Sequence, residues 1–155
     1  MKIIKKLKNN RGMTLIEIMV VVTILGMIAT IATVNVLGRL DQAKVTSTKT
    51  QMKNLETALD EYKRDNGFYP DSGQGLEALV QKPASGKVPT NYPRGGYIKG
   101  GSTPKDAWSH DFQYMSPGAH GNAVEIISLG ADGEEGGEDV DADINSWEIG
   151  TTRRE

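Results

Sequence analysis

The residues best suited to chemistry form one acidic segment near the end of this 155-residue chain. Residues 132–143 read DGEEGGEDVDAD and hold seven acids, three glycines and no base. A run of like charges repels itself and favours disorder. Carboxylate and carbonyl oxygens on a flexible glycine-rich loop are also the ligands that calcium takes. The composition leaves two interpretations open, a disordered acidic loop or a loop that calcium organises.

The spacing of these acids does not follow the EF-hand pattern. Asp139, Asp141 and Asp143 alternate as that pattern requires. Ile144, however, stands where glycine is needed, and Gly150 stands where the last glutamate is needed. A calcium loop in this chain must therefore use another ligand arrangement.

A second candidate is Glu17, the single ionisable residue of the apolar segment 13–37. A carboxylate inside a lipid-facing helix costs roughly 2.5–3.5 kcal/mol on insertion scales, so a partner is expected. Cleavage between Gly12 and Met13 would create an α-amine about one helical turn away. That amine would neutralise Glu17 within one chain or between subunits, where it would also set axial register. The alternative is an acid tolerated near the cytoplasmic interface.

Catalytic constellations are not found in the sequence. His110 and His120 lie in turn-like segments without an evident nucleophile or metal partner, and Ser128 lacks the G-x-S-x-G elbow. There is no P-loop, and no G-x-G-x-x-G opens a helix. The sequence predicts that the chain is not an enzyme.

Charge and cysteine content exclude further classes. The formal net charge is −2, but residues 1–12 carry five bases and no acid, which leaves −7 on the remainder. A nucleic-acid binder would group basic residues on its folded part, so no nucleic-acid partner is expected. The chain has no cysteine, which excludes disulfides and thiolate ligands.

The apolar segment 13–37 is long enough to span a bilayer as a helix. The basic residues before it would keep that flank in the cytoplasm. Three interpretations compete. The segment is a signal peptide cut near Ala29 or Ala32, an uncleaved anchor, or the start of a mature chain whose leader is cut before the apolar run.

The pattern becomes amphipathic after Gly38. Apolar residues recur at helical spacing, and they are Val45, Met52, Leu55, Leu59 and Tyr62. Asn66-Gly67 is a stop signal. The pattern predicts one helix over residues 14–65, with a break near residues 35–38 as the alternative.

The remainder, residues 67–155, is rich in glycine and proline. A short helix is predicted over residues 75–81. Short strands are predicted between turn residues; they cover residues 97–99, 112–115, 123–128 and 147–149. The predicted fold is α+β, with a small antiparallel sheet packed on the long helix. Aromatic residues make up 6% of the chain, and three of them, Trp108, Tyr114 and Trp147, are expected to pack in the core of this part.

The leader has a specific pattern. Residues 8–24 read KNNRGMTLIEIMVVVTI, which resembles the class III signal of type IV pilins and pseudopilins. The resemblance implies that a prepilin peptidase cuts after Gly12 and methylates the amine of Met13. Two positions depart from the family pattern, since Met13 replaces the usual Phe and Val34 replaces a frequent Pro.

Three further segments are more specific: NGFYPDSGQGLEALVQKP (66–83), QYMSPGAHG (113–121) and SLGADGEEGG…DADINSW (128–147). They resemble the major pseudopilin of type II secretion systems. The resemblance implies one calcium bound in loop 129–146, with the Leu129 carbonyl, Asp132, Asp141 and Asp143 as ligands. A frequent DPWG turn of the family is Asp106-Ala107-Trp108-Ser109 here, so an altered turn is expected.

The resemblance also implies an organisation and a function. Residues 1–12 are a cleaved leader, 13–37 a transmembrane and filament-core helix, 38–66 its amphipathic half, and 67–155 a periplasmic globular domain. The chain would be a single-pass inner-membrane protein that polymerises into a periplasmic pseudopilus and helps push folded proteins through the outer membrane. Implied partners are further copies, minor pseudopilins, the prepilin peptidase and an inner-membrane assembly platform.

Two alternatives remain at this point. One is a type IV or competence pilin, although such subunits often carry a carboxyl-terminal disulfide and this chain has no cysteine. The other is a membrane-anchored periplasmic binding module that does not polymerise, in which Glu17 has no assembly role.

Overall fold

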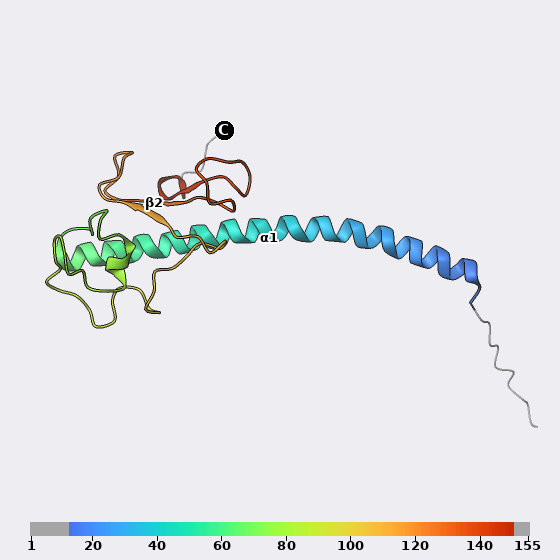
Figure 1. The fold of residues 1–155 in the computed structure, drawn as a ribbon, viewed down its shortest axis with the longest axis horizontal. Helices are drawn as coiled ribbons and strands as arrows, with labels where there is room; N and C mark the ends of the chain where they lie inside the picture. The colour runs from blue at the N-terminus through green and yellow to red at the C-terminus, as the bar shows by residue number, and fades with distance from the viewer. Residues whose placement is uncertain (1–12, 151–155) are drawn as a thin grey trace, which may run out of the picture. The chain divides into compact units, whose positions relative to one another are not determined.

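The computed structural model describes residues 13–150. Its elements in chain order are α1 (Leu15–Asn66), the 3-10 helix η1 (Leu76–Leu79), β1 (Gln113–Met115), β2 (Glu125–Ser128), β3 (Ile144–Asn145) and the 3-10 helix η2 (Ser146–Glu148) (Figure 1). The chain divides into two compact units, Met1–Arg39 and Leu40–Glu155. The predicted leader and its last residue, Gly12, lie outside the described residues.

In the first unit, α1 begins directly after Thr14 and presents apolar side chains to its surroundings. Leu15 is 80% exposed and Ile16 is 71% exposed, and the apolar residues that follow as far as Ile28 are exposed as well. Among the residues described, no helix is both long and apolar enough to cross a bilayer. The predicted transmembrane half of the helix, residues 13–37, is therefore not confirmed.

The backbone of α1 continues without interruption through residues 35–38, so the alternative of two separate helices is wrong. The helix ends at Asn66. Gly67 follows with φ 81°, in the left-handed region, and its N–H donates to the Lys63 carbonyl at 2.6 Å. The predicted stop signal at Asn66-Gly67 is confirmed.

In the second unit, one face of α1 forms half of the core. Met52, Leu55, Leu59 and Tyr62 are at most 1% exposed, and Val45 packs partly buried at the edge of the cluster. The predicted apolar stripe is therefore confirmed. The other half of the core comes from η1, Phe112, β2 and β3.

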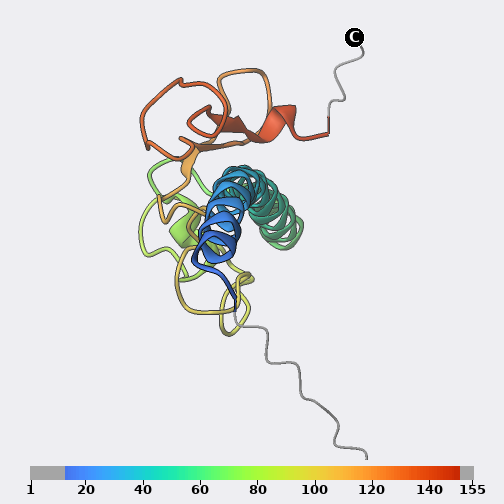
Figure 2. The same cartoon turned by 90° about the vertical axis from the view of Figure 1, so that its right-hand side faces the viewer.

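The sheet is small and antiparallel, with strand order β1-β2-β3. Gln113 is opposite Ile127 and Met115 is opposite Glu125, while Ser128 pairs with Ile144. In both views the segment that holds β2 and β3 lies along one side of α1 (Figures 1 and 2). The α+β prediction is confirmed, with strands one to two residues shorter than predicted over 112–115 and 123–128.

The strand predicted over residues 97–99 is wrong. The N–H groups of Tyr97 and Ile98 donate to the Leu79 carbonyl at 2.7 and 3.2 Å, so they cap the end of η1. The ring of Tyr97 packs against Tyr62 and Tyr92, with centroids 5.3 and 5.4 Å apart. An aromatic residue between glycines suits a strand locally, but here its partners are a helix end and two rings.

The strand predicted over residues 147–149 is also wrong. Pairing with β2 ends at Asn145, and Ser146–Glu148 forms η2, closed by a bond from the Ile149 N–H to the Ser146 carbonyl at 3.2 Å. The Ser146 hydroxyl accepts a bond from the Ile126 N–H at 3.1 Å. A side chain thus takes the place of the next backbone partner, and the ladder stops.

Tyr62 offers a test of this core. Its ring is fully buried and packs edge-on against Phe68 at 5.9 Å, and burial raises the pKa of its phenol. Its hydroxyl has no hydrogen-bond partner in the described chain. We expect Tyr62→Phe to leave the free energy of unfolding unchanged or to raise it by about 1 kcal/mol, because an unsatisfied buried polar group is removed.

Urea denaturation followed by circular dichroism measures this change. Tyr62→Ala is the matched control and should cost about 3–5 kcal/mol, since the ring itself is lost. A loss of more than 1 kcal/mol in Tyr62→Phe would show that the hydroxyl has a stabilising partner.

Candidate functional site

The acidic segment is a folded loop between β2 and β3. Its two arms lie side by side, because the Ala131 N–H donates to the Val140 carbonyl at 2.9 Å. A second closure joins the Asp143 N–H to the Gly136 carbonyl at 3.1 Å. Backbone bonds therefore hold together a loop that carries seven acids and no base.

The first arm holds two of the predicted ligands. The Leu129 carbonyl accepts a bond from the Gly133 N–H at 3.2 Å, which makes residues 129–133 a turn. Asp132 is exposed, and its Oδ1 accepts the Glu134 N–H at 3.0 Å. Gly133 has φ 72°, in the left-handed region that favours glycine.

The second arm holds the other two. Asp141 and Asp143 are half-buried, and Asp143 Oδ2 accepts the Gly136 N–H at 3.1 Å. Close packing joins the arms at Gly130, where an added Cβ would lie 2.6 Å from the Asp141 carbonyl oxygen. The loop thus brings residues 129–133 near residue 141.

Asp143 has a feature that fits a cation. Its Oδ1 is buried and has no hydrogen-bond partner in the described chain. A buried carboxylate oxygen is costly unless it is paired, and a hard cation is one such partner. Among the described residues, however, no three His, Cys, Asp or Glu side chains form a metal-holding group. Calcium also takes backbone carbonyl oxygens as ligands, and the Leu129 carbonyl lies in the same loop.

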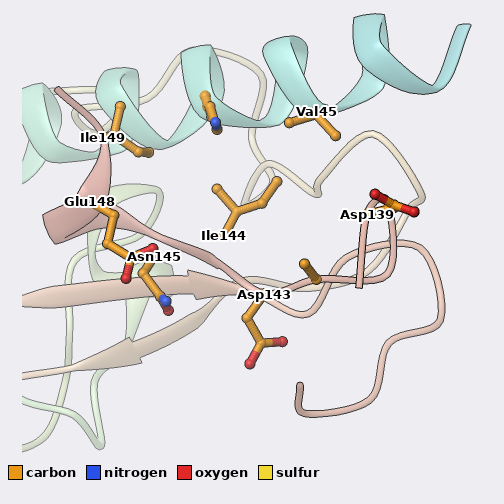
Figure 3. A pocket seen from close by; sticks show the side chains of 9 residues that line it. Val45, Asp139, Asp143, Ile144, Asn145, Glu148 and Ile149 are labelled. Carbon is orange, nitrogen blue, oxygen red and sulfur yellow. The ribbon is translucent and has the colours of Figure 1, made fainter. Parts of the chain in front are cut away.

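Beside this loop lies a pocket of about 160 Å³. Val45 and Lys49 of α1 form one wall, and Asp139, residues 142–145, Glu148 and Ile149 form the rest. Figure 3 shows Ile144 pointing toward α1 and the Asp143 carboxylate pointing away from it. Asp143 therefore lines the pocket while its carboxylate points away from α1.

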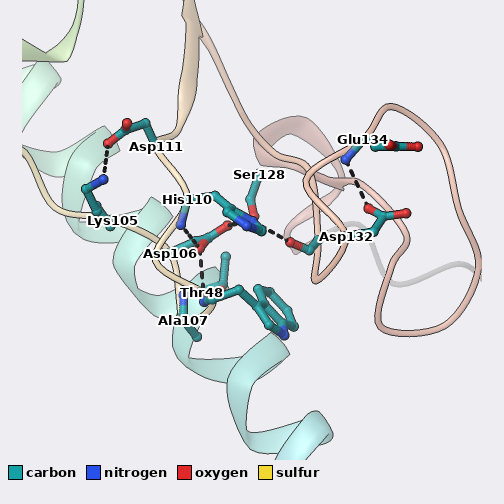
Figure 4. Close-up of polar contacts among 11 residues, drawn as sticks. Thr48, Lys105, Asp106, Ala107, His110, Asp111, Ser128, Asp132 and Glu134 are labelled. Atoms are coloured by element: carbon teal, nitrogen blue, oxygen red, sulfur yellow. Dashed lines mark hydrogen bonds and ion pairs between the residues drawn. The ribbon is translucent and has the colours of Figure 1, made fainter.

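A second cluster of polar contacts centres on the buried carboxylate of Asp106 (Figure 4). Its Oδ1 accepts the N–H groups of Trp108 and His110 at 3.0 and 2.8 Å. Its Oδ2 accepts the hydroxyl of Ser128 at 2.7 Å, at the end of β2. The Ala107 N–H donates to the Thr48 hydroxyl of α1 at 3.2 Å.

Residues 106–109, where an altered turn was expected, form a turn that one backbone hydrogen bond closes. The Ser109 N–H donates to the Asp106 carbonyl at 3.1 Å. Ser109 has φ 73°, so a serine occupies the left-handed conformation that favours glycine. Trp108 and Tyr114 pack partly buried against the core, as predicted.

The first unit shows how Glu17 is held within its own chain. The Thr14 N–H donates to Glu17 Oε2 at 3.4 Å, and the Glu17 N–H donates to the Thr14 hydroxyl at 3.3 Å. This reciprocal pair is a capping box, which satisfies two free donors at the start of α1. Met13, the predicted mature terminus, is 66% exposed directly before it.

A further carboxylate, that of Glu125, has a role that nothing in the sequence predicted. It is fully buried, and its oxygens accept bonds from the Ala119 and His120 N–H groups, from Asn122 Nδ2 and from His120 Nδ1 at 2.7–3.1 Å. The His120 ring stacks on Trp147 at 4.3 Å between centroids. The GAHGN turn signal could have indicated a tight loop, but nothing local indicated which acid closes it.

Comparison with known proteins bears on both units. Residues 35–147 match the family described as type II secretion system protein G, and residues 7–33 match the prokaryotic N-terminal methylation motif. The type II secretion system core protein G of Vibrio cholerae is 50% identical over 145 residues, which cover 94% of this chain and 97% of that protein. The core protein G of Pseudomonas aeruginosa is 50% identical over 141 residues, 91% of this chain and 97% of that protein.

The fold is similar to a solved structure as well. The crystal structure of the major pseudopilin from the type 2 secretion system of enterohaemorrhagic Escherichia coli matches with a TM-score of 0.61 and 39% identity. The match covers 73% of this chain and 94% of that chain. The long amino-terminal helix and small antiparallel sheet of this chain are thus the fold of a pseudopilin. The chain belongs to the type II secretion system protein G family.

The pKa of Glu125 predicts how stability depends on pH. Burial acts to raise this pKa, but the bonds donated by His120, Asn122 and Ala119 outweigh it and lower the pKa from 4.5 to about 2. A folded-state pKa below the unfolded value gives stability that is complete above about pH 4.5 and is lost as pH falls toward 2.

We therefore expect the melting temperature of the wild type to fall steeply between pH 4.5 and 2. Glu125→Gln should melt at a lower temperature at neutral pH and show a shallower acid dependence. Thermal melts of both proteins across this range check the prediction. Parallel pH curves for the two proteins would show that another group carries the acid sensitivity.

Proposed function

We propose that this chain is the structural subunit of the pseudopilus of a type II secretion system. Copies polymerise into a periplasmic helical filament that helps push folded proteins through the outer membrane. The observation that carries this proposal is the match to a solved major pseudopilin, which covers 94% of that chain. Family membership also supports a structural subunit over an enzyme.

The amino terminus supports a processed precursor. The match of residues 7–33 to the N-terminal methylation motif favours cleavage after Gly12 and methylation of the Met13 amine by a prepilin peptidase. Before assembly the subunit lies in the inner membrane with its second unit in the periplasm, because the five bases of residues 1–12 favour the cytoplasmic side.

Exposed apolar side chains in the first unit support polymerisation. Residues 15–28 of α1 include Leu15, Ile16, Met19 and Leu25, each at least 60% exposed. A subunit that leaves the membrane must cover this surface, and the same helix of neighbouring copies is apolar enough to do so. The assembly is open and helical, so one surface of a copy meets a different surface of the next. Minor pseudopilins and an inner-membrane platform are the further partners that we propose.

Glu17 sets the register of this assembly. Within residues 13–150, the Thr14 N–H is the one hydrogen-bond donor to its carboxylate, at 3.4 Å. That contact caps the helix, and no basic side chain among the described residues pairs with the carboxylate. The methylated amine of Met13, from the same or a neighbouring copy, supplies the cation that a carboxylate needs in an apolar surrounding.

We also propose that calcium organises loop 129–146. The Leu129 carbonyl, Asp132, Asp141 and Asp143 would hold the ion. The unpartnered, buried Oδ1 of Asp143 supports this assignment. Bound calcium supplies positive charge, which offsets the repulsion among the acids of the loop. The second unit has no cysteine and few regular elements, so a cation would take the part that a disulfide plays in other small domains.

The assembly proposal is tested by Glu17→Ala, expressed with a prepilin peptidase and the secretion system. We expect wild-type protein to begin at methylated Met13 by intact mass and to form filaments. The variant should reach the membrane and show the same terminus but assemble at a small fraction of the wild-type amount. Glu61→Gln, an exposed change in the second unit, is the control. Normal filaments from Glu17→Ala would refute the register role, and a wild-type start at Met1 would refute the processing.

The calcium proposal predicts a ligand-dependent melting temperature. Chelation should lower it, and calcium at 100 times its dissociation constant should restore about 2.7 kcal/mol of stability. Asp143→Asn should lose most of this response, whereas Asp111→Asn, a change at a mostly exposed carboxylate paired with Lys105 at 3.2 Å, should keep it. A melting temperature that is the same in chelator and in calcium would refute the site.

A further inference from the structure

The segment 106–110 connects α1 to the acidic loop. It contacts α1 through the bond from the Ala107 N–H to Thr48, a residue that is fully buried. It contacts the end of β2 through Asp106 and Ser128, one residue before the acidic loop begins. Its last residue, His110, contacts the loop itself (Figure 4).

The imidazole of His110 lies against both ends of one turn. Its Nδ1 is 3.1 Å from the Gly130 carbonyl oxygen. A carbonyl only accepts, so Nδ1 carries the proton and donates. The ring also lies against Gly133, where an added Cβ would be 3.2 Å from Cε1. Because Gly133 has φ 72°, both the tight space and the left-handed backbone conformation at this position favour glycine.

This turn is the one that carries two proposed calcium ligands. Leu129 directly precedes Gly130, and Asp132 directly precedes Gly133, and these are the two glycines that His110 contacts. The Gly133 N–H donates a hydrogen bond to the Leu129 carbonyl. His110 is itself held by Asp106. The backbone N–H of His110 donates to Asp106 Oδ1 at 2.8 Å, and its ring Nδ1 lies 3.9 Å from Asp106 Oδ2.

We propose that His110 is a positioning residue for cation binding in the acidic loop. This inference rests on the calcium site proposed above. By donating to Gly130 and packing against Gly133, His110 holds the turn 129–133 in one conformation before the ion arrives. Glycine loses more conformational freedom than other residues when it is ordered, so a turn ordered in advance binds the ion at a smaller entropic cost.

Calcium titration calorimetry on the full-length chain in detergent micelles tests the proposal. We expect His110→Leu to bind calcium about tenfold or more weakly, the effect typical of removing a residue that orients metal ligands. His110→Asn should bind within about twofold of the wild type, because its side-chain amide can place a donor where Nδ1 stands. Lys105→Ala, at the residue directly before this segment and paired with Asp111, is the control.

The rescue separates positioning from general stability. Melting in chelator reports the stability of each variant without the ion. A positioning role requires His110→Leu and His110→Asn to differ in calcium affinity by more than their melting temperatures in chelator explain. If His110→Leu does not fold, His110→Gln replaces it, since its longer amide places the donor away from the Nδ1 position.

Each outcome decides one of the two proposals. Wild-type protein that does not bind calcium would overturn the calcium site, and with it the premise of this inference. Wild-type binding together with equal affinity in His110→Leu, or in His110→Gln, would overturn the role of His110 alone. Asn as weak as Leu would also overturn it, because the donated hydrogen bond would then not be the cause.

Discussion

The burial of one face of α1 is the interaction on which the second unit depends. Met52, Leu55, Leu59 and Tyr62 lie at most 1% exposed, and they form one core cluster with buried residues of η1, β2 and β3 and with Phe112. The sheet that the structure describes has three strands of two to four residues, shorter than the usual five or six, so it needs packing against another element for stability. The helix therefore provides the surface on which the sheet and the long loops are arranged.

Buried carboxylates hold the loops where regular structure is missing. Asp106 accepts bonds from its own turn and from the end of β2, and Glu125 accepts four bonds from the loop that follows β1. A buried carboxylate is stable only when donors surround it, so each one fixes the positions of several backbone groups at once. The acidic loop is the opposite case, because its seven acids outnumber the hydrogen-bond donors that reach them from the described residues. That contrast is the physical reason to expect a cation in the loop and none at Asp106 or Glu125.

The apolar residues of α1 have different surroundings in the two units of the chain. In the second unit the apolar face of α1 is covered by the rest of its own chain. In the first unit the large apolar residues of α1 as far as Ile28 are exposed within the single chain. Membership in the protein G family and the match to a major pseudopilin explain this division, since a filament subunit must leave part of its apolar surface for its neighbours.

The sequence by itself determined the helix over residues 15–66, its buried stripe, its stop at Asn66-Gly67 and the family of the chain. These features depend on local periodicity and on motifs that are contiguous in the chain. Tertiary structure alone decided that Tyr97 caps η1 and that Ser146 ends the sheet. It also decided that Asp106 and Glu125 are buried carboxylates that accept several hydrogen bonds. A strand forms only where a partner strand pairs with it. A buried carboxylate is stable only where hydrogen-bond donors from other segments of the chain surround it. The sequence pointed to the acidic loop by composition, whereas the contact of His110 with Gly130, 20 residues away, became evident only in the folded chain.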